Sequence, residues 1–164
     1  YFWYEDPFKA GGVSAHAHRK LRELIRTPLL QGEHVRGLEQ HVDLILAEAT
    51  DFVRVDAYLD GGLTGAMKIA HAAEGMGLDV EIHGPGPAHR HLMTAIRNTN
   101  YYELGLVHPK ATAHYGYAYQ DYTEDLDAID QNGCVFAPTG PGIGVRLDWD
   151  YIRSRDPVTQ VFEA

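Results

Sequence analysis

The sequence predicts an α/β fold in which parallel strands alternate with helices, as one part of a (β/α) barrel. Short runs rich in β-branched and aromatic residues alternate along the chain with runs of helical periodicity. Each strand-like run also ends on or near an acidic or histidine side chain. One such residue per strand–helix unit is typical of a barrel, which assembles its active site from successive strand ends.

The first two units occupy the N-terminal part of the chain. Residues 1–5 (YFWYE) are expected to form a strand, and residues 14–26 a helix that Ser14 caps. Residues 28–33 (PLLQGE) form the second expected strand. Residues 37–50 carry apolar side chains at helical spacing and form the second expected helix.

The next units follow the same pattern. Residues 52–56 (FVRVD) are strand-like, and residues 63–77 form a long expected helix that ends among glycines. Residues 80–83 (VEIH) are the fourth strand and residues 88–98 a short helix. Residues 101–107 (YYELGLV) form the last expected strand.

The alternation stops at about residue 121, where the sequence becomes acidic and rich in turn-forming residues. We therefore divide the chain into residues 1–120, the C-terminal half of a barrel, and residues 121–164, a C-terminal tail. Because the expected strands are too few to close a barrel, an unpaired edge and an apolar interior would be exposed. We expect the chain to be the C-terminal part of a longer protein and to require the upstream part.

The polar residues at the strand ends are spaced by 28, 23, 27 and 20 positions; they are Glu5, Glu33, Asp56, His83 and Glu103. A doubly wound sheet also places ligands at strand ends, but it does not usually draw a titratable group from every strand. The barrel is therefore favoured. Other histidines lie within expected helices, where solvated faces are the expected setting; these are His16, His18, His89 and His91.

Composition excludes several classes of partner. The formal net charge is −9 and no lysine or arginine run interrupts it, so a nucleic-acid partner is not expected. No apolar stretch approaches the roughly 20 residues that span a membrane. Cys134 is the only cysteine, which excludes an internal disulfide and favours a cytoplasmic location.

The ordered motifs resemble the enolase superfamily, and within it the mandelate racemase subgroup, which contains many sugar-acid dehydratases. The motifs are Glu-x-Pro at Glu5, Gly-Glu at Glu33, Asp56 followed by Gly-Gly-x-Thr-Gly, then His83 and Glu103. The resemblance implies a (β/α)7β barrel of the TIM type, of which this chain would supply about strands 4 to 8. It also implies that the tail returns toward a capping domain that this chain lacks.

The resemblance implies a chemistry and a role for each strand-end residue. Members abstract the proton α to a carboxylate, and a bound Mg²⁺ stabilises the resulting negative charge. Glu5 and Glu33 would be metal ligands, while a third ligand would lie on the preceding strand. Asp56 and His83 would form the base pair, with the carboxylate orienting the imidazole. Glu103 would hydrogen-bond the substrate carboxylate as a protonated acid, although pairing with an arginine is the alternative.

Two further residues are candidates for substrate binding. His34 directly follows Glu33 and is placed to act as an acid or hydrogen-bond donor. Strand alternation predicts that Tyr101 shares the face of Glu103, whereas Tyr102 points away.

Three functions remain open at this point. The first is a magnesium-dependent lyase that removes water from an aldonate or aldarate to give a 2-keto-3-deoxy acid. The second is a racemase or epimerase of a 2-hydroxy acid with the same base. The third is a catalytically silent barrel that serves as a binding or assembly subunit. The expected partners are a small-molecule carboxylate substrate and other copies of the protein in a homo-oligomer.

Overall fold

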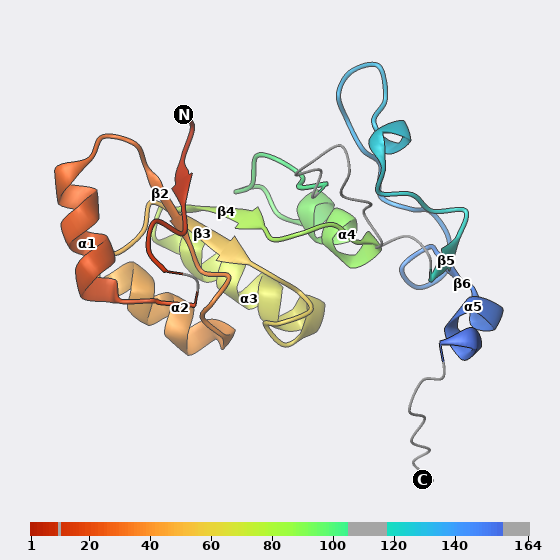
Figure 1. Ribbon diagram of the computed structural model, residues 1–164, viewed down its shortest axis with the longest axis horizontal. Helices are drawn as coiled ribbons and strands as arrows, with labels where there is room; N and C mark the ends of the chain where they lie inside the picture. Colours follow the sequence, from red (N-terminus) through yellow and green to blue (C-terminus); the bar gives the residue numbers. More distant parts are fainter. Residues whose placement is uncertain (10, 105–117, 156–164) are drawn as a thin grey trace, which may run out of the picture.

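The computed structural model describes residues 1–9, 11–104 and 118–155. Its centre is a sheet of parallel strands in the order β1-β2-β3-β4, joined by helices (Figure 1). The strands are β1 (Tyr4–Glu5), β2 (Leu29–Gln31), β3 (Phe52–Val55) and β4 (Asp79–Ile82). The helices that follow them are α1 (Ala15–Leu24), α2 (Gly37–Leu46), α3 (Gly62–Gly75) and α4 (Pro87–Ala95). The predicted parallel sheet is confirmed.

Local sequence signals explain most helix limits. The Ser14 hydroxyl accepts a hydrogen bond from the Ala17 backbone N–H at 3.3 Å, which caps α1 as expected. Helix α2 ends at Leu46 rather than at residue 50, because Glu48 adopts a left-handed backbone conformation with φ 56°. Helix α3 ends at Gly75, as expected, and Gly77 then turns the chain with φ 77°.

The hydrophobic core lies between the sheet and the helices that cover it. Alternate residues of β3 and β4 point toward α3, whose buried face carries small and branched side chains. The main contributors are Val53, Val55, Val80 and Ile82 from the strands, and Ala66, Ile69, Ala70 and Ala73 from α3. The intervening strand residues face the opposite side of the sheet, where Arg54 and Glu81 are buried. In a closed barrel this second face is the interior.

The expected last strand is not found where the structure describes it. Residues 101–104 form no strand, and residues 105–107 lie outside the described residues. The reason is that the Tyr101 backbone N–H donates to the Glu81 carboxylate at 3.1 Å rather than to a neighbouring strand. The alternation of side chains expected for Tyr101 and Tyr102 therefore does not apply.

The last described segment, residues 118–155, contains short elements of its own and includes most of the expected tail. Strands β5 (Tyr119–Gln120) and β6 (Arg146–Leu147) pair antiparallel, with the 3-10 turn η2 (Leu126–Ala128) between them and α5 (Trp149–Ser154) after them. The tail extends beyond α4, on the side of the molecule away from α1 (Figure 1). An ion pair between Arg90 of α4 and Glu124, at 2.7 Å, joins it to the barrel part.

The expectation of solvated helical histidines is wrong for two residues. His18 is 1% exposed and His89 is 0% exposed. The His18 ring donates through Nδ1 to the Ser14 carbonyl at 2.8 Å, so a local hydrogen bond satisfies it inside the fold. Across the described residues, no helix combines the length and apolarity needed to cross a bilayer.

Candidate functional site

The predicted site residues gather at one edge of the sheet because parallel strands end on the same side. Glu5 is the last residue of β1, and Asp56 and His83 directly follow β3 and β4. Glu33 lies two residues after β2. Four separate units therefore each contribute one of these side chains to a shared area.

Asp56 and His83 form a close pair. The His83 Nδ1–Asp56 Oδ2 distance is 2.8 Å, and Asp56 also accepts from the Tyr58 backbone N–H at 2.7 Å. Burial raises the pKa of Asp56, but hydrogen bonds, led by that of His83, outweigh burial and keep this pKa well below its ordinary range. The bond to Asp56 raises the pKa of His83, with burial opposing it. Asp56 thus stays anionic and directs the Nε2 atom of His83 outward.

The glycines after His83 shape the loop that leaves the ring accessible. Gly84 has φ 72° and Gly86 has φ 151°, conformations that residues with a Cβ rarely adopt. A Cβ on Gly86 would also lie 2.3 Å from the Tyr58 hydroxyl oxygen. The Gly-Pro-Gly segment therefore lets Tyr58 approach the loop and turns the chain away from the His83 ring.

The glycine of the Gly-Glu motif has a comparable role. Gly32 has φ 144°, and a Cβ there would lie 2.4 Å from the Arg54 carbonyl oxygen. Only a glycine allows β2 to end this close to β3, which brings Glu33 to the site. Glu33 Oε2 then lies 3.5 Å from His83 Nε2.

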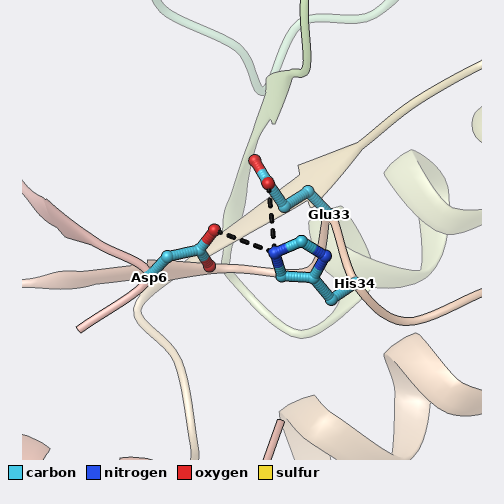
Figure 2. Close-up of side chains that lie close together, drawn as sticks. All are labelled: Asp6, Glu33 and His34. Atoms are coloured by element: carbon cyan, nitrogen blue, oxygen red, sulfur yellow. Dashed lines mark ion pairs between the residues drawn. The ribbon is translucent and has the colours of Figure 1, made fainter. Parts of the chain in front are cut away.

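Glu33 also meets His34 and Asp6 (Figure 2). His34 Nε2 lies 3.3 Å from Glu33 Oε1 and 3.4 Å from Asp6 Oδ2. One ligand atom from each of these three residues falls within 4.8 Å of the others, as in a metal-binding group. Sequence reasoning included Glu33 and His34 but missed Asp6, although it directly follows Glu5.

Arg54 is the central residue that sequence reasoning missed. Its Nε atom donates to Glu5 Oε1 at 2.6 Å, and its Nη2 atom lies 3.1 Å from Glu103 Oε2. Burial raises the pKa of Glu5, Arg54 opposes this effect, and the charges of Glu103 and Glu33 add to it. The one sequence signal is that Arg54 lies two residues before Asp56, so alternation directs both side chains to the same face of the sheet, although it does not identify Glu5 as the partner of Arg54.

Glu103 has two partners in the structure. The Gly84 backbone N–H donates to its Oε2 atom at 2.7 Å, and Arg54 Nη2 forms an ion pair with the same oxygen at 3.1 Å. The alternative that the sequence left open, an ion pair with an arginine, is therefore present. The contact with Gly84 also connects Glu103 to the residue that follows His83.

Tyr101 is not brought together with these residues. Its ring packs against Phe2 and Trp3, with centroid distances of 5.4 and 5.9 Å, near the start of β1 rather than its end. Tyr102, expected to point away, instead reaches the loop after His83. Its hydroxyl oxygen accepts from the Gly86 backbone N–H at 2.8 Å and its O–H donates to Glu124 at 2.7 Å.

The acidic side chains fit a hard divalent cation. Mg²⁺ prefers carboxylate oxygens, and Glu5 and Glu33 present them at neighbouring strand ends. Each oxygen of Glu5 accepts one bond from Arg54, which leaves a second lone pair on each. Burial is the first cause of the raised pKa of Glu5, and the negative charges of Glu103 and Glu33 add a smaller contribution. A cation at this point would offset the repulsion between these charges.

Fold and site together define a part of a (β/α) barrel with an acid–imidazole pair and carboxylates at its strand ends. The chain belongs to the family described as enolase C-terminal domain-like, whose model matches residues 1–151. It is part of a (β/α)7β barrel of the enolase superfamily, as predicted, and its structural neighbours are mandelate racemase-type enzymes.

Sugar-acid dehydratases are prominent among the similar proteins. The L-talarate/galactarate dehydratase of Salmonella typhimurium is 34% identical over 93 residues, covering 57% of this chain and 23% of that protein. The D-glucarate dehydratase of Agrobacterium tumefaciens, solved in complex with magnesium, superposes with a TM-score of 0.77 at 28% identity. That match covers 94% of this chain and 39% of the neighbour.

Another neighbour and a relative of different activity extend the comparison. The L-talarate dehydratase of Polaromonas sp. JS666, solved with Mg and L-glucarate, gives a TM-score of 0.69 at 29% identity over 93% of this chain and 37% of that one. The N-succinyl-L-Arg/Lys racemase of Bacillus cereus is 31% identical over 80 residues, 49% of this chain and 21% of that protein. In all these matches the chain spans less than half of the similar protein's length.

Proposed function

We propose that this chain supplies the base and two metal ligands of a magnesium-dependent sugar-acid dehydratase. The observation that carries the proposal is the buried Asp56 bonded to His83 at 2.8 Å, beside the carboxylate Glu33 at the strand ends. The substrate would be an aldonate or aldarate and the product a 2-keto-3-deoxy acid. The names of the similar proteins support this choice, since most of them are dehydratases of such acids.

His83 is the proposed base. Because the Nδ1–H bonds Asp56, the basic lone pair is on Nε2. The His83 side chain is 35% exposed and lies at the edge of the sheet where the strands end. Asp56 holds the ring in this tautomer and stabilises the imidazolium that forms when Nε2 takes the α proton. The raised pKa of His83, caused first by the bond to Asp56, makes Nε2 a stronger base than a free imidazole.

Glu5 and Glu33 are the proposed magnesium ligands within this chain. When bound, Mg²⁺ would supply Lewis-acid stabilisation of the negative charge that develops on the substrate carboxylate. Glu103 is proposed to meet that carboxylate on the other side. Arg54 already contacts Glu103, so the guanidinium offsets part of the repulsion between the two acids. His34, beside Glu33, is proposed as a donor to a substrate hydroxyl.

A racemase is the second candidate, because proton abstraction by the same pair begins either reaction. The observation that favours it is the similarity to the N-succinyl-L-Arg/Lys racemase. A silent barrel is less favoured, since it predicts the loss of a base or a metal ligand, and the sequence keeps Glu5, Glu33, Asp56 and His83.

The test uses the full-length protein and a library of aldonates and aldarates with Mg²⁺ present. Formation of a 2-keto acid supports the dehydratase, whereas a change in optical rotation without keto acid supports the racemase. His83→Asn should abolish exchange of the substrate α proton with deuterium, while the exposed His71 of α3, changed to Asn, should leave exchange intact. Calorimetry of Glu33→Gln should show weakened magnesium binding. Wild-type exchange in His83→Asn would remove this base from the chemistry.

A further inference from the structure

His89 is a buried imidazole next to the proposed base pair. It lies in the first turn of α4 and is 0% exposed. The Tyr58 ring packs against it in a T-shaped arrangement, with centroids 4.7 Å apart. A polar ring enclosed in this way must have its hydrogen bonds satisfied within the protein, so its partners decide its state.

Two backbone contacts assign the proton of this ring. Nδ1 lies 3.0 Å from the Gly84 carbonyl oxygen, which can only accept, so Nδ1 carries a proton. Nε2 accepts from the Ala57 backbone N–H at 3.0 Å, so Nε2 carries a lone pair. The ring is therefore neutral and in the Nδ1-protonated tautomer.

Nε2 also lies 3.2 Å from Asp56 Oδ1, a distance that a charged imidazole could use for an ion pair. Nε2 cannot both accept from the Ala57 N–H and carry a proton for an ion pair with Asp56, because that proton would face the N–H of Ala57. We favour the neutral ring, since a buried backbone N–H without an acceptor costs about 1–3 kcal/mol. Asp56 Oδ1 already accepts from the Tyr58 N–H and does not require the second donor.

The two partners of His89 are the chain neighbours of the base pair. Ala57 directly follows Asp56, and Gly84 directly follows His83. One rigid ring thus joins the segment after β3 to the segment after β4, on either side of the Asp56–His83 hydrogen bond. Any change in the separation of the two segments would strain both contacts of the ring.

We propose that His89 is a positioning residue, which as a neutral imidazole connects Ala57 to Gly84 and so sets the distance between Asp56 and His83. Its consequence for catalysis rests on the proposed function, whereas the bridge itself does not. Glutamine carries both a donor and an acceptor and can replace part of the bridge, while leucine fills the space without either group.

The experiment is nitrogen-15 NMR of histidine-labelled full-length protein, without substrate, at a pH well above the ordinary histidine pKa. His89 should show a protonated Nδ1 and an unprotonated Nε2. His83 should show a protonated, strongly hydrogen-bonded Nδ1. In His89→Leu the His83 Nδ1–H signal should move toward that of a solvated ring, in His89→Gln it should largely persist, and in His71→Leu it should not change. Circular dichroism melting checks that each variant folds.

The proposal is overturned by a His89 ring that carries its proton on Nε2 or on both nitrogens, or by an unchanged His83 signal in His89→Leu. The wild-type tautomer decides the matter even if His89→Leu does not fold. Once a substrate is known, His89→Leu should lower kcat about 100-fold with little effect on KM, as expected for a misplaced base. A protein that acts on no sugar acid would refute the proposed function, while the ring tautomers would still test the bridge.

Discussion

Replacing Arg54 with methionine should destabilise the protein more than any exposed arginine substitution. Methionine keeps much of the apolar stem but removes the guanidinium that bonds Glu5 at 2.6 Å and lies 3.1 Å from Glu103. Removing one partner of a buried ion pair typically costs 3–5 kcal/mol. The Arg54 side chain is 6% exposed, but those of Glu5 and Glu103 are 26% and 35% exposed and retain some water. We therefore expect a loss of about 3 kcal/mol, the lower end of that range.

The loss should depend on pH with a defined sign. Burial raises the folded-state pKa of Glu5 and Arg54 opposes it, so Arg54→Met raises this pKa further. A glutamate with a raised folded-state pKa contributes stability below its ordinary pKa and loses that contribution as pH rises through the raised value. The difference in free energy of unfolding between Arg54→Met and the wild type should therefore be largest at neutral pH and smaller in mild acid.

Urea unfolding of the full-length protein at several pH values measures this difference as a shift in midpoint at constant slope. Arg97→Met is the matched control, because its side chain is 86% exposed and its ion pair with Glu74 should contribute less than about 1 kcal/mol. If Arg54→Met is no more destabilising than Arg97→Met, or if its effect on stability grows in acid, Arg54 does not stabilise the charges of Glu5 and Glu103.

Two further predictions concern the tail and helix α3. Glu124→Leu should lower the free energy of unfolding by about 3 kcal/mol, because it leaves the buried Arg90 without its anionic partner. Limited proteolysis should then cut the tail faster than in the wild type, and an unchanged cleavage rate would contradict the anchoring role. Gly65→Ala should lower the free energy of unfolding by about 3 kcal/mol, since its Cβ would lie 1.7 Å from the Asp60 carbonyl oxygen. Gly75→Ala is the control: its Cβ would meet no atom within 4 Å, and thermal melts should show a neutral or slightly stabilising effect.

The sequence by itself determined the strand–helix alternation and the residues at the strand ends. Period-two and helical patterns are local properties, so β3, β4 and their helices follow from neighbouring residues. The close Asp56–His83 pair followed from the same information, because parallel strands that end on one side bring their next residues together. The end of α2 did not follow, because the left-handed conformation of Glu48 ends the helix early. The absence of a strand at residues 101–104 did not follow either, because the Tyr101 N–H bonds the distant Glu81 carboxylate.

Only the tertiary structure decided which side chains surround the strand-end residues. Arg54 meets Glu5 from 49 positions away, and His89 meets Ala57 from 32 positions away. Neither pair has a local signature, because a lone arginine in a strand or a lone histidine in a helix is usually solvated. Burial reverses that expectation here, because a polar group removed from water must find a partner. The order of the strands in the sheet and the placement of α4 decide which partner lies within reach.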